Sequence, residues 1–278
     1  MPLQQLVEYF NDRFGLEHHS SFRPIMLENG LASGLFGPIR INSKFSPLHN
    51  PNKPDVISGY AAQLTVATYD PLLLQHQQIE SLLANSEDHN INFDSIINFD
   101  RLARTIHMLN YLPIAHLEQT LFVDVDPRHI LSIKKDHGAY FEEVITKCGL
   151  QTHNVVLVTG INTYFSHYYP ELQTGFDNYR SRGYQIGLRF NAFNKSSQLL
   201  DSIHKLAPNF VCISTDTVAE KQNIADFSAK LQAIKARVDA INGSILLSNI
   251  RDESMGKLAI DHAVDLVEGS YYQPFSVD

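Results

Sequence analysis

Apolar residues at the start of the chain recur every three or four positions. They are Leu3, Leu6, Val7, Phe10 and Phe14. This spacing places the five side chains on one face of an α-helix. Gly15 suits the end of that helix, because glycine readily adopts the left-handed conformation that follows many last turns. We therefore expect the chain to open with an amphipathic helix.

Two short runs of β-forming residues follow the helical pattern, at residues 22–25 and 31–40. The tripeptide Glu28-Asn29-Gly30 separates them, and Asn-Gly favours the tight turn of an antiparallel hairpin. The pattern predicts a β-hairpin after the first helix.

The pattern changes between residues 41 and 92. Residues 41–55 are rich in Pro, Asn, Ser and Lys, which predicts a surface loop. Residues 57–69 contain β-forming residues in alternation, residues 71–84 have a helical pattern, and residues 86–92 are polar again. We interpret residues 41–92 as an elaboration on a more regular fold.

From Phe99 to the end, patterns typical of helices and strands alternate. Strands are expected at residues 121–127, 155–159, 184–190, 208–214, 244–251 and 265–272. This alternation is what a (β/α) barrel requires. A chain of 278 residues, 44% of them hydrophobic, can form such a barrel as one domain.

Composition and charge exclude several classes of protein. The formal net charge of −8 provides no basic field for nucleic acid. No apolar run approaches the roughly 18 residues of a membrane span, and the first residues lack the pattern of a secretion signal. Cys148 and Cys212 form no metal or redox spacing. We expect a cytoplasmic protein that binds neither nucleic acid nor membrane.

The stretch at residues 183–214 resembles the core of the EAL-domain family, bacterial enzymes that hydrolyse cyclic di-GMP. In that family one strand continues into Leu-Asp-Asp-Phe-Gly-Thr-Gly-Tyr-Ser-Ser, and the next strand has the sequence Pro-Asp-Phe-Val-Lys-Ile-Asp. The scaffold positions of these motifs match Leu188, Ser196, Ser197, Pro208, Phe210, Val211 and Ile213. Weaker matches follow in the family's order over most of the chain. The resemblance implies a TIM-like (β/α) barrel of the EAL type over residues 1–278, with an N-terminal helix and an atypical insertion at residues 41–92.

Most residues that carry the family's reaction are replaced in this chain. The reaction needs two divalent cations, held mostly by carboxylates, to polarise a phosphate and generate hydroxide. Alignment of the motifs places these residues at the family's metal and catalytic positions: Phe36, Asp124, Val158, Arg189, Phe190, Cys212, Ser248 and Glu268. Val and Phe cannot ligate a metal, and Arg adds positive charge where the cations would lie. The resemblance therefore implies a degenerate domain, a pseudoenzyme with no catalytic residues and no metal or other cofactor.

The assignment of Phe36 depends on the predicted hairpin. The family's barrel opens with Phe-Gln-Pro-Ile and a strand Gly-Phe-Glu-Ala-Leu-Leu-Arg, which we align with residues 22–25 and 30–40. Phe36 then falls at the metal-binding Glu, and Arg40 falls at the Arg that contacts a phosphate of the dinucleotide.

Three cationic residues keep a ligand-binding role open. Arg40, Arg189 and Lys195 could contact a phosphate at the barrel mouth. A non-hydrolytic cyclic di-GMP receptor is therefore the alternative function. Acidic residues at the same mouth repel a dianionic ligand, so we expect cyclic di-GMP binding to be weak or absent.

Asp124 and Asp126 allow two interpretations. Residues two apart on a strand share a face, so both carboxylates could face the mouth with Glu268 nearby. They would then hold Mg²⁺ or Mn²⁺ and support a residual phosphodiesterase. In the interpretation that we favour, Arg189 has replaced the cation and neutralises these carboxylates.

We therefore expect a catalytically inactive protein of bacterial cyclic di-GMP signalling that acts through protein–protein interaction with an unidentified partner. The opening helix and residues 41–92 are the expected contact surfaces. The resemblance also implies a homodimer, because dimerisation through the barrel is common in the family.

Overall fold

The computed structural model describes residues 2–18, 21–37, 39–68, 93–115, 119–132, 138–162, 164–190, 196–217 and 224–273. Lys195, the predicted helix at residues 71–84 and the predicted loop at residues 86–92 lie outside these stretches.

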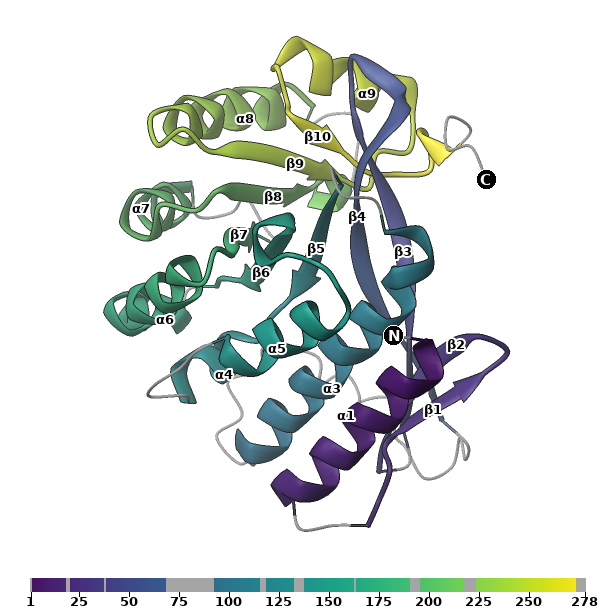
Figure 1. Cartoon of the computed structure of the whole chain (residues 1–278). Helices are drawn as coiled ribbons and strands as arrows, with labels where there is room; N and C mark the ends of the chain where they lie inside the picture. The colour runs from purple at the N-terminus through teal and green to yellow at the C-terminus, as the bar shows by residue number, and fades with distance from the viewer. Residues whose placement is uncertain are drawn as a thin grey trace.

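Eight strands of the described residues close into a barrel (Figure 1). In chain order they are β3 (Ile39–Asn50), β4 (Lys53–Thr68), β5 (Thr120–Asp124), β6 (Val155–Gly160), β7 (Gln185–Phe190), β8 (Phe210–Ser214), β9 (Ser244–Ser248) and β10 (Leu266–Val267). Strands β4 to β10 run parallel, and β3 closes the barrel by pairing antiparallel with both β4 and β10. The expected TIM-like barrel is confirmed, with one antiparallel strand in its wall.

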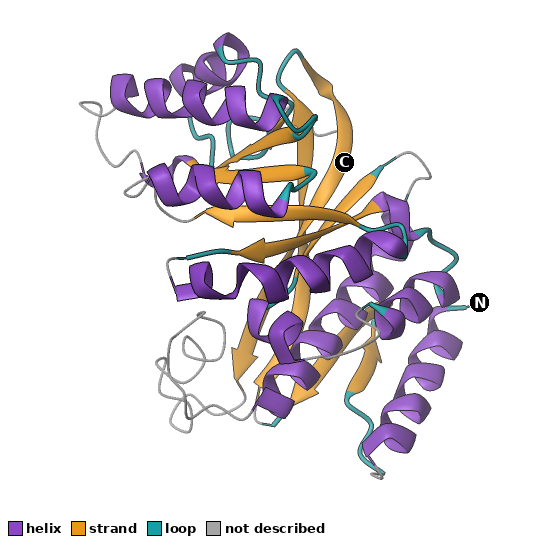
Figure 2. Ribbon diagram, turned by 90° about the vertical axis from the view of Figure 1, so that its left-hand side faces the viewer, coloured by secondary structure: helices purple, strands orange, loops and turns teal. Residues whose placement is uncertain are grey.

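Helices pack on the outer face of these strands, as Figure 2 shows. They are α3 (Phe93–Tyr111), α4 (Pro127–Ser132), α5 (Ala139–Lys147), α6 (Tyr169–Ser181), α7 (Ser196–Leu206), α8 (Ile224–Asp239) and α9 (Glu253–Asp261). Short 3-10 turns occur at Leu112–Ile114, Thr152–Asn154, Tyr164–Tyr168 and Thr215–Thr217. The main core lies between the helices and the barrel wall, and a smaller apolar cluster fills the barrel itself.

The opening helix α1 (Leu3–His18) buries Leu6, Val7 and Phe10, as the pattern predicts. It continues three residues beyond Gly15, so this glycine is not its C-cap. The ion pair between Arg13 and Glu17 spans one turn across Gly15 and supports the last turn of the helix.

The predicted hairpin is present as β1 (Ile25–Glu28) and β2 (Leu31–Phe36). Asn29 and Gly30 have φ values of 52° and 80°, which fit the tight turn expected there. The returning strand ends at Phe36, because Gly37 turns the chain with φ 58° before β3 begins. Strands β1 and β2 extend the sheet beyond β3 and stand outside the closed barrel.

Two asparagine side chains hold this hairpin in place. Asn11 of α1 bonds both backbone groups of Ile25, at 2.8 and 2.9 Å. Asn110 of α3 bonds both backbone groups of Ala32, each at 2.7 Å. Each amide side chain therefore replaces a neighbouring strand at one position of the hairpin.

The loop predicted at residues 41–55 is wrong, because β3 and β4 form one long hairpin there. Residues 41–68 thus belong to two strands of the barrel wall and are not an insertion on the barrel. Side chains of β3 alternate between the two faces of the strand. Phe45 packs on α3 on the outer face, whereas Lys44 and Ser46 lie on the inner face, near the mouth. Because the inner face of β3 is polar near the mouth, the amino-acid composition of this strand resembles that of a surface loop.

Candidate functional site at the barrel mouth

The carboxyl ends of the parallel strands gather at one end of the barrel, which we call the mouth. In barrels of this kind, chemistry takes place at this end. Charged and amide side chains at the mouth include Lys44 of β3, Gln63 of β4, Asp124 of β5, Arg189 of β7 and Glu268 directly after β10. After β8 and β9, Asp216 accepts hydrogen bonds from Asn249 and Arg251.

Arg189 and Asp124 form an ion pair across the mouth. Arg189 Nη1 donates to Asp124 Oδ2 at 2.6 Å, and the side chains are 41% and 54% exposed. The Asp124 carboxylate raises the pKa of the Arg189 guanidinium above its ordinary value, in spite of the opposing effect of burial. Arg189 therefore stays charged and places a fixed cation beside Asp124 at the mouth, whereas Asp126, which the favoured interpretation also assigned to Arg189, pairs with Arg128.

Glu268 completes a second polar contact at the mouth. Its Oε1 accepts a hydrogen bond of 2.9 Å from Gln63 Nε2. Burial raises the pKa of Glu268, while a hydrogen bond from Ser46 and the charges of Arg189 and Lys44 lower it in part. Arg189 and Lys44 thus offset part of the negative charge of Asp124 and Glu268.

An apolar floor lies directly below these charges. It is formed by Leu48, Ala61, Phe122, Val156, Val158, Cys212 and Leu246. Val158 and Cys212, both aligned with the family's catalytic positions, belong to this floor. Burial raises the pKa of Cys212 to about 12, so its sulfur is a protonated thiol at neutral pH. Ser248 Oγ donates to the Ile213 carbonyl at 3.3 Å.

Phe36 and Arg40 do not lie on the strand that the family alignment requires. Phe36 belongs to β2, outside the closed barrel, and its ring packs edge-to-face on Phe99 at 5.2 Å. Arg40 pairs with Glu28 of the opening hairpin at 2.6 Å. The contact expected between Arg40 and a phosphate beside Arg189 is therefore not supported by its position.

Strand β4 occupies the barrel position expected for that motif. The family's Gly-Phe-Glu-Ala-Leu-Leu-Arg fits Gly59-Tyr60-Ala61-Ala62-Gln63-Leu64-Thr65, which places Ala61 at the Glu. The β1–β2 and β3–β4 hairpins share this sequence pattern. In each, a proline in or just before the first strand is followed by a glycine where the motif begins: Pro24 and Gly30, then Pro47 and Gly59. Only the pairing with β5 shows which hairpin forms the barrel wall.

Two further assignments are corrected by strand geometry. Phe190 follows Arg189 on β7, so its side chain points to the opposite face and is buried in the outer core. Residues two apart share a face only within a strand. Strand β5 ends at Asp124, so Asp126 lies beyond the strand and does not share the face of Asp124 on this ground. Asp126 instead accepts hydrogen bonds from Arg128 Nε and Nη2, at 3.0 and 2.7 Å.

The three residual metal candidates therefore do not converge. Asp124 is bonded to Arg189, Asp126 to Arg128, and Glu268 to Gln63. Within the described stretches, no group of three or more His, Cys, Asp and Glu side chains is arranged to hold a metal ion. Sequence reasoning missed Lys44 and Gln63, because it placed Lys44 in a loop and aligned β4 with no family motif.

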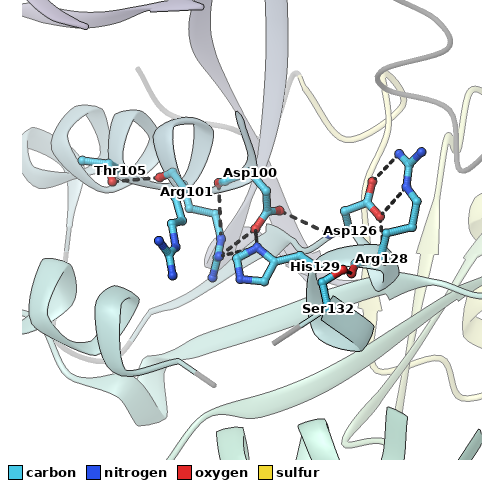
Figure 3. A network of polar contacts seen from close by, with 8 residues as sticks. Asp100, Arg101, Thr105, Asp126, Arg128, His129 and Ser132 are labelled. Atoms are coloured by element: carbon cyan, nitrogen blue, oxygen red, sulfur yellow. Dashed lines mark hydrogen bonds and ion pairs between the residues drawn. The ribbon is translucent and has the colours of Figure 1, made fainter. Parts of the chain in front are cut away.

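A buried polar network lies behind the mouth, between α3 and α4 (Figure 3). Arg104 Nη2 donates to Asp100 Oδ2 at 2.6 Å, and His129 Nδ1 contacts the same oxygen. These three side chains are 8% exposed or less. Burial alone would raise the pKa of Asp100, but Arg104 and His129 lower it to about 2. The other Asp100 oxygen accepts the amide of Asp126 at 3.2 Å, which fixes the turn after β5.

The comparisons with known proteins agree on the fold. No family model and no curated protein sequence matches the chain. Solved EAL structures do match. The Bacillus subtilis YkuI protein, in complex with c-di-GMP and calcium, has a TM-score of 0.63 and 17% sequence identity over 84% of this chain. Klebsiella pneumoniae BlrP1, in complex with calcium and c-di-GMP, has a TM-score of 0.66 and 12% sequence identity over 88% of this chain. This chain spans 55% and 57% of the length of those two proteins.

A third match covers nearly the whole of both chains. The EAL domain of Xanthomonas citri FimX, in complex with c-diGMP, has a TM-score of 0.64 and 16% identity over 99% of this chain and 96% of its own. The fold is therefore that of an EAL domain, and the resemblance seen in the sequence is confirmed at the level of the fold. No helix in the described stretches is long and apolar enough to cross a membrane.

Proposed function

We propose that this chain is a catalytically inactive EAL-fold protein of bacterial cyclic di-GMP signalling that acts through contact with another protein. The observation that carries the proposal is the ion pair between Arg189 and Asp124 at the mouth. Two-metal hydrolysis needs carboxylates that are free to bind cations. Here the Asp124 carboxylate is paired with the Arg189 guanidinium, and the side chains below them are apolar.

Protein contact is supported by the surface of the opening elements. Leu16 and Phe22 are 78% and 47% exposed, and Leu31 of β2 is 63% exposed. These large apolar side chains on the opening helix, the segment after it and the hairpin are available for contact with a partner. Of the second contact surface expected from the sequence, residues 41–92, residues 41–68 form strands of the barrel wall, and residues 69–92 lie outside the described residues.

Hydrolysis is tested with purified protein and cyclic di-GMP in Mg²⁺ or Mn²⁺, with product followed by chromatography. An active EAL phosphodiesterase serves as the positive control. We expect no product above the buffer blank. Product that disappears when the cation is chelated would contradict the proposal.

Protein contact is tested by crosslinking in bacterial cells followed by identification of the captured proteins. The double variant Leu16→Asp, Phe22→Asp is expected to lose a partner that the wild type captures. Val56→Asp, at a residue of β4 that is 57% exposed, is the matched control and should retain it. Equal capture by the wild type and both variants would exclude this surface.

A non-hydrolytic receptor for cyclic di-GMP is the second candidate. It is favoured by Lys44 and Arg189, which put two cations at the mouth, and by the full-length similarity to an EAL domain solved with c-diGMP. Calorimetry with and without Mg²⁺ separates the two candidates. Binding that weakens in Lys44→Gln would make the protein a receptor, whereas no heat in either condition would favour the interaction role alone.

A further inference from the structure

Strand β4 has a free edge beyond its pairing with β5. Among the described residues, β5 pairs with β4 only at residues 59–61, whereas β3 pairs with β4 as far as Thr68. In the described part of the chain, residues 64–68 thus have a neighbouring strand only on the side of β3, in the long hairpin that Figure 1 shows. The backbone groups on the other side of β4 decide what this edge can bind.

The N–H and C=O groups of Val66 point towards this free edge. In an antiparallel ladder, successive residues direct these two groups to opposite sides of the strand. Asn110 bonds both groups of Ala32, on the side of β2 away from β1. Gly34, two residues later, directs its groups to the same side, where it pairs with Ile41 of β3. Ile41 thus directs its groups to β2, and Val66, which lies opposite Ile41, directs its own away from β3.

The position of Pro47 agrees with this assignment. Pro47 lies opposite Tyr60 and has no N–H to donate to it, so Tyr60 directs its groups to its other neighbour, β5. Leu64 and Val66 follow Tyr60 by an even number of residues, so their groups point to the same side. In the described part of the chain, no backbone hydrogen bond outside the ladder with β3 involves these two residues.

The edges of β1 and β4 differ in how they are protected. Proteins protect exposed edges with charges, proline, bulges or very short strands. The edge strand β1 has four residues and ends at Glu28, and the Asn11 side chain occupies both backbone groups of Ile25. Residues 62–68 of β4 have the sequence Ala-Gln-Leu-Thr-Val-Ala-Thr, without charge, proline or glycine. The edge of β4 is therefore suited to receive another strand.

The side chains beside this edge define the pattern of that strand. Leu64 and Val66 are half-buried and pack on the main core, whereas Gln63 and Thr65 are exposed on the other face, where Gln63 bonds Glu268. Side chains alternate between the faces of an added strand as well. Apolar residues therefore suit the positions beside Leu64 and Val66, and polar residues suit those between them.

The length of the edge favours a single segment over a second copy of the chain. Five residues of a strand are about 17 Å long. Two folded copies joined along this edge alone would fall short of the about 1,200 Å² that stable interfaces bury. A flexible segment needs only the main-chain bonds and the alternating side-chain contacts, which is a common mode of peptide recognition.

We infer that the free edge of β4 binds an extended segment of a partner protein, with apolar residues at every second position, by addition of a strand to the sheet. The backbone groups of Leu64 and Val66 form the main-chain bonds of this contact. The inference goes beyond the proposed function, because strand addition requires neither an inactive mouth nor the surface of Leu16 and Phe22. Either can therefore fail without the other.

The free edge itself is tested by amide hydrogen exchange of the full chain, followed by NMR. Thr65 lies opposite Asn42 and directs its N–H to β3, whereas Leu64 and Val66 direct theirs to the edge. We expect the amides of Leu64 and Val66 to exchange about tenfold faster than that of Thr65, the effect of one hydrogen bond. Equal exchange of the three amides would mean that the chain covers this edge itself, and it would overturn the inference.

Binding is tested with the probe peptide acetyl-Lys-Val-Thr-Val-Thr-Val-Lys-amide, titrated into the labelled chain. The peptide has the required alternation, and its terminal lysines keep it soluble. We expect the peptide to slow the exchange of the Leu64 and Val66 amides and to shift their NMR signals. No change at millimolar peptide would overturn the inference, as would protection of these amides that rises with protein concentration alone, because a second copy would then cover the edge.

Two methylated peptides separate main-chain pairing from side-chain contact. One carries N-methyl groups on its valines and the other on its threonines. A strand directs alternate N–H groups to its neighbour, so one peptide loses its donors to β4 and the other keeps them. We expect the first to bind at least about tenfold more weakly than the parent peptide and the second to bind like it. Equal binding of all three peptides would contradict strand addition.

Two variants of Val66 provide the matched test on the protein. Val66→Pro removes the N–H that points to the edge and leaves the ladder with β3 in place, so we expect it to weaken peptide binding about tenfold. Val66→Thr also changes the side chain but keeps the N–H, and it should bind nearly as the wild type does. Circular dichroism checks that both variants are folded, and the methylated peptides need no variant. Equal binding by both variants would overturn the inference.

Discussion

Arg189 on β7 and Asp124 on β5 face each other across β6, and their side chains meet at 2.6 Å over the barrel mouth. Each side chain remains about half exposed, so water screens the attraction between them. The pair therefore determines the charge at the mouth more than it determines the stability of the fold.

We predict that Arg189→Gln lowers the free energy of unfolding by only about 0.5 kcal/mol, the range of exposed ion pairs. A double-mutant cycle with Asp124→Asn, followed by urea unfolding, isolates the interaction between the two side chains. A coupling energy of several kcal/mol would mean that the pair is a structural element of the barrel.

The buried network behind the mouth should behave in the opposite way. Asp100→Asn leaves Arg104 buried without its counter-charge, so we expect a loss of about 3–5 kcal/mol in the free energy of unfolding. Asp177→Asn breaks a pair of similar helical spacing with Arg180, but Asp177 is 60% exposed, and the change should cost less than about 1 kcal/mol. Similar losses in the two variants would show that burial does not govern these pairs.

His107 should make the stability depend on pH. It is buried on α3, hydrogen-bonded to Ser43 of β3 at 2.8 Å, and burial lowers its pKa to about 4. The unfolded chain has a higher histidine pKa, about 6.5, and so binds the proton first as the pH falls. Stability is therefore full above pH 6.5 and declines towards pH 4, by up to about 3 kcal/mol.

The measurement is urea unfolding at pH values between 7.5 and 4 for the wild type and His107→Gln. The variant should show a shallower decline over this interval, although it is less stable at neutral pH. His129 contributes in the same direction, since burial lowers its pKa as well. Parallel declines in the two proteins would show that His107 does not titrate as described.

Asn110 allows a graded test of how the opening hairpin is held. Asn110→Ala removes both bonds to Ala32 and leaves its buried backbone groups unpaired, so we expect a loss of about 2–3 kcal/mol. Asn110→Asp can still accept from the Ala32 amide but cannot donate to its carbonyl, and it should be intermediate. Thermal unfolding followed by circular dichroism ranks the three proteins, and equal stability of wild type and Asn110→Ala would exclude the docking role.

The regular part of the fold could be predicted from the sequence because its local patterns agree with its contacts. From Phe99 on, strands are continuous apolar runs buried on both faces, and helices have one apolar face, so each element is visible by itself. The opening helix and hairpin were visible for the same reason. The single-domain organisation over residues 1–278 stays a prediction.

The first barrel strand, β3, could not be predicted, because its pattern depends on contacts remote in the sequence. The alternation at residues 57–69 does predict β4, but it does not show that this strand belongs to the barrel wall. Lys44 and Ser46 are polar residues inside a barrel wall, and they fit there only because the mouth is polar. The resulting loop assignment shifted the family alignment by one hairpin and placed Phe36 and Arg40 on the wrong strand. Asp126 was misplaced because sequence alone does not show that β5 ends two residues earlier.

The barrel closes through a narrow seam. Strand β10 has two residues, and its register with β3 consists of the single pair Val267 and His49. The wall along this line is reinforced by side chains: Gln63 bonds Glu268, and Tyr272 stacks on His49 at 5.9 Å. A seam with so few main-chain bonds opens at lower free energy than the strands opposite. Amide protons of β10 will therefore exchange with solvent before those of β6 and β7, because local opening of the barrel begins between β10 and β3.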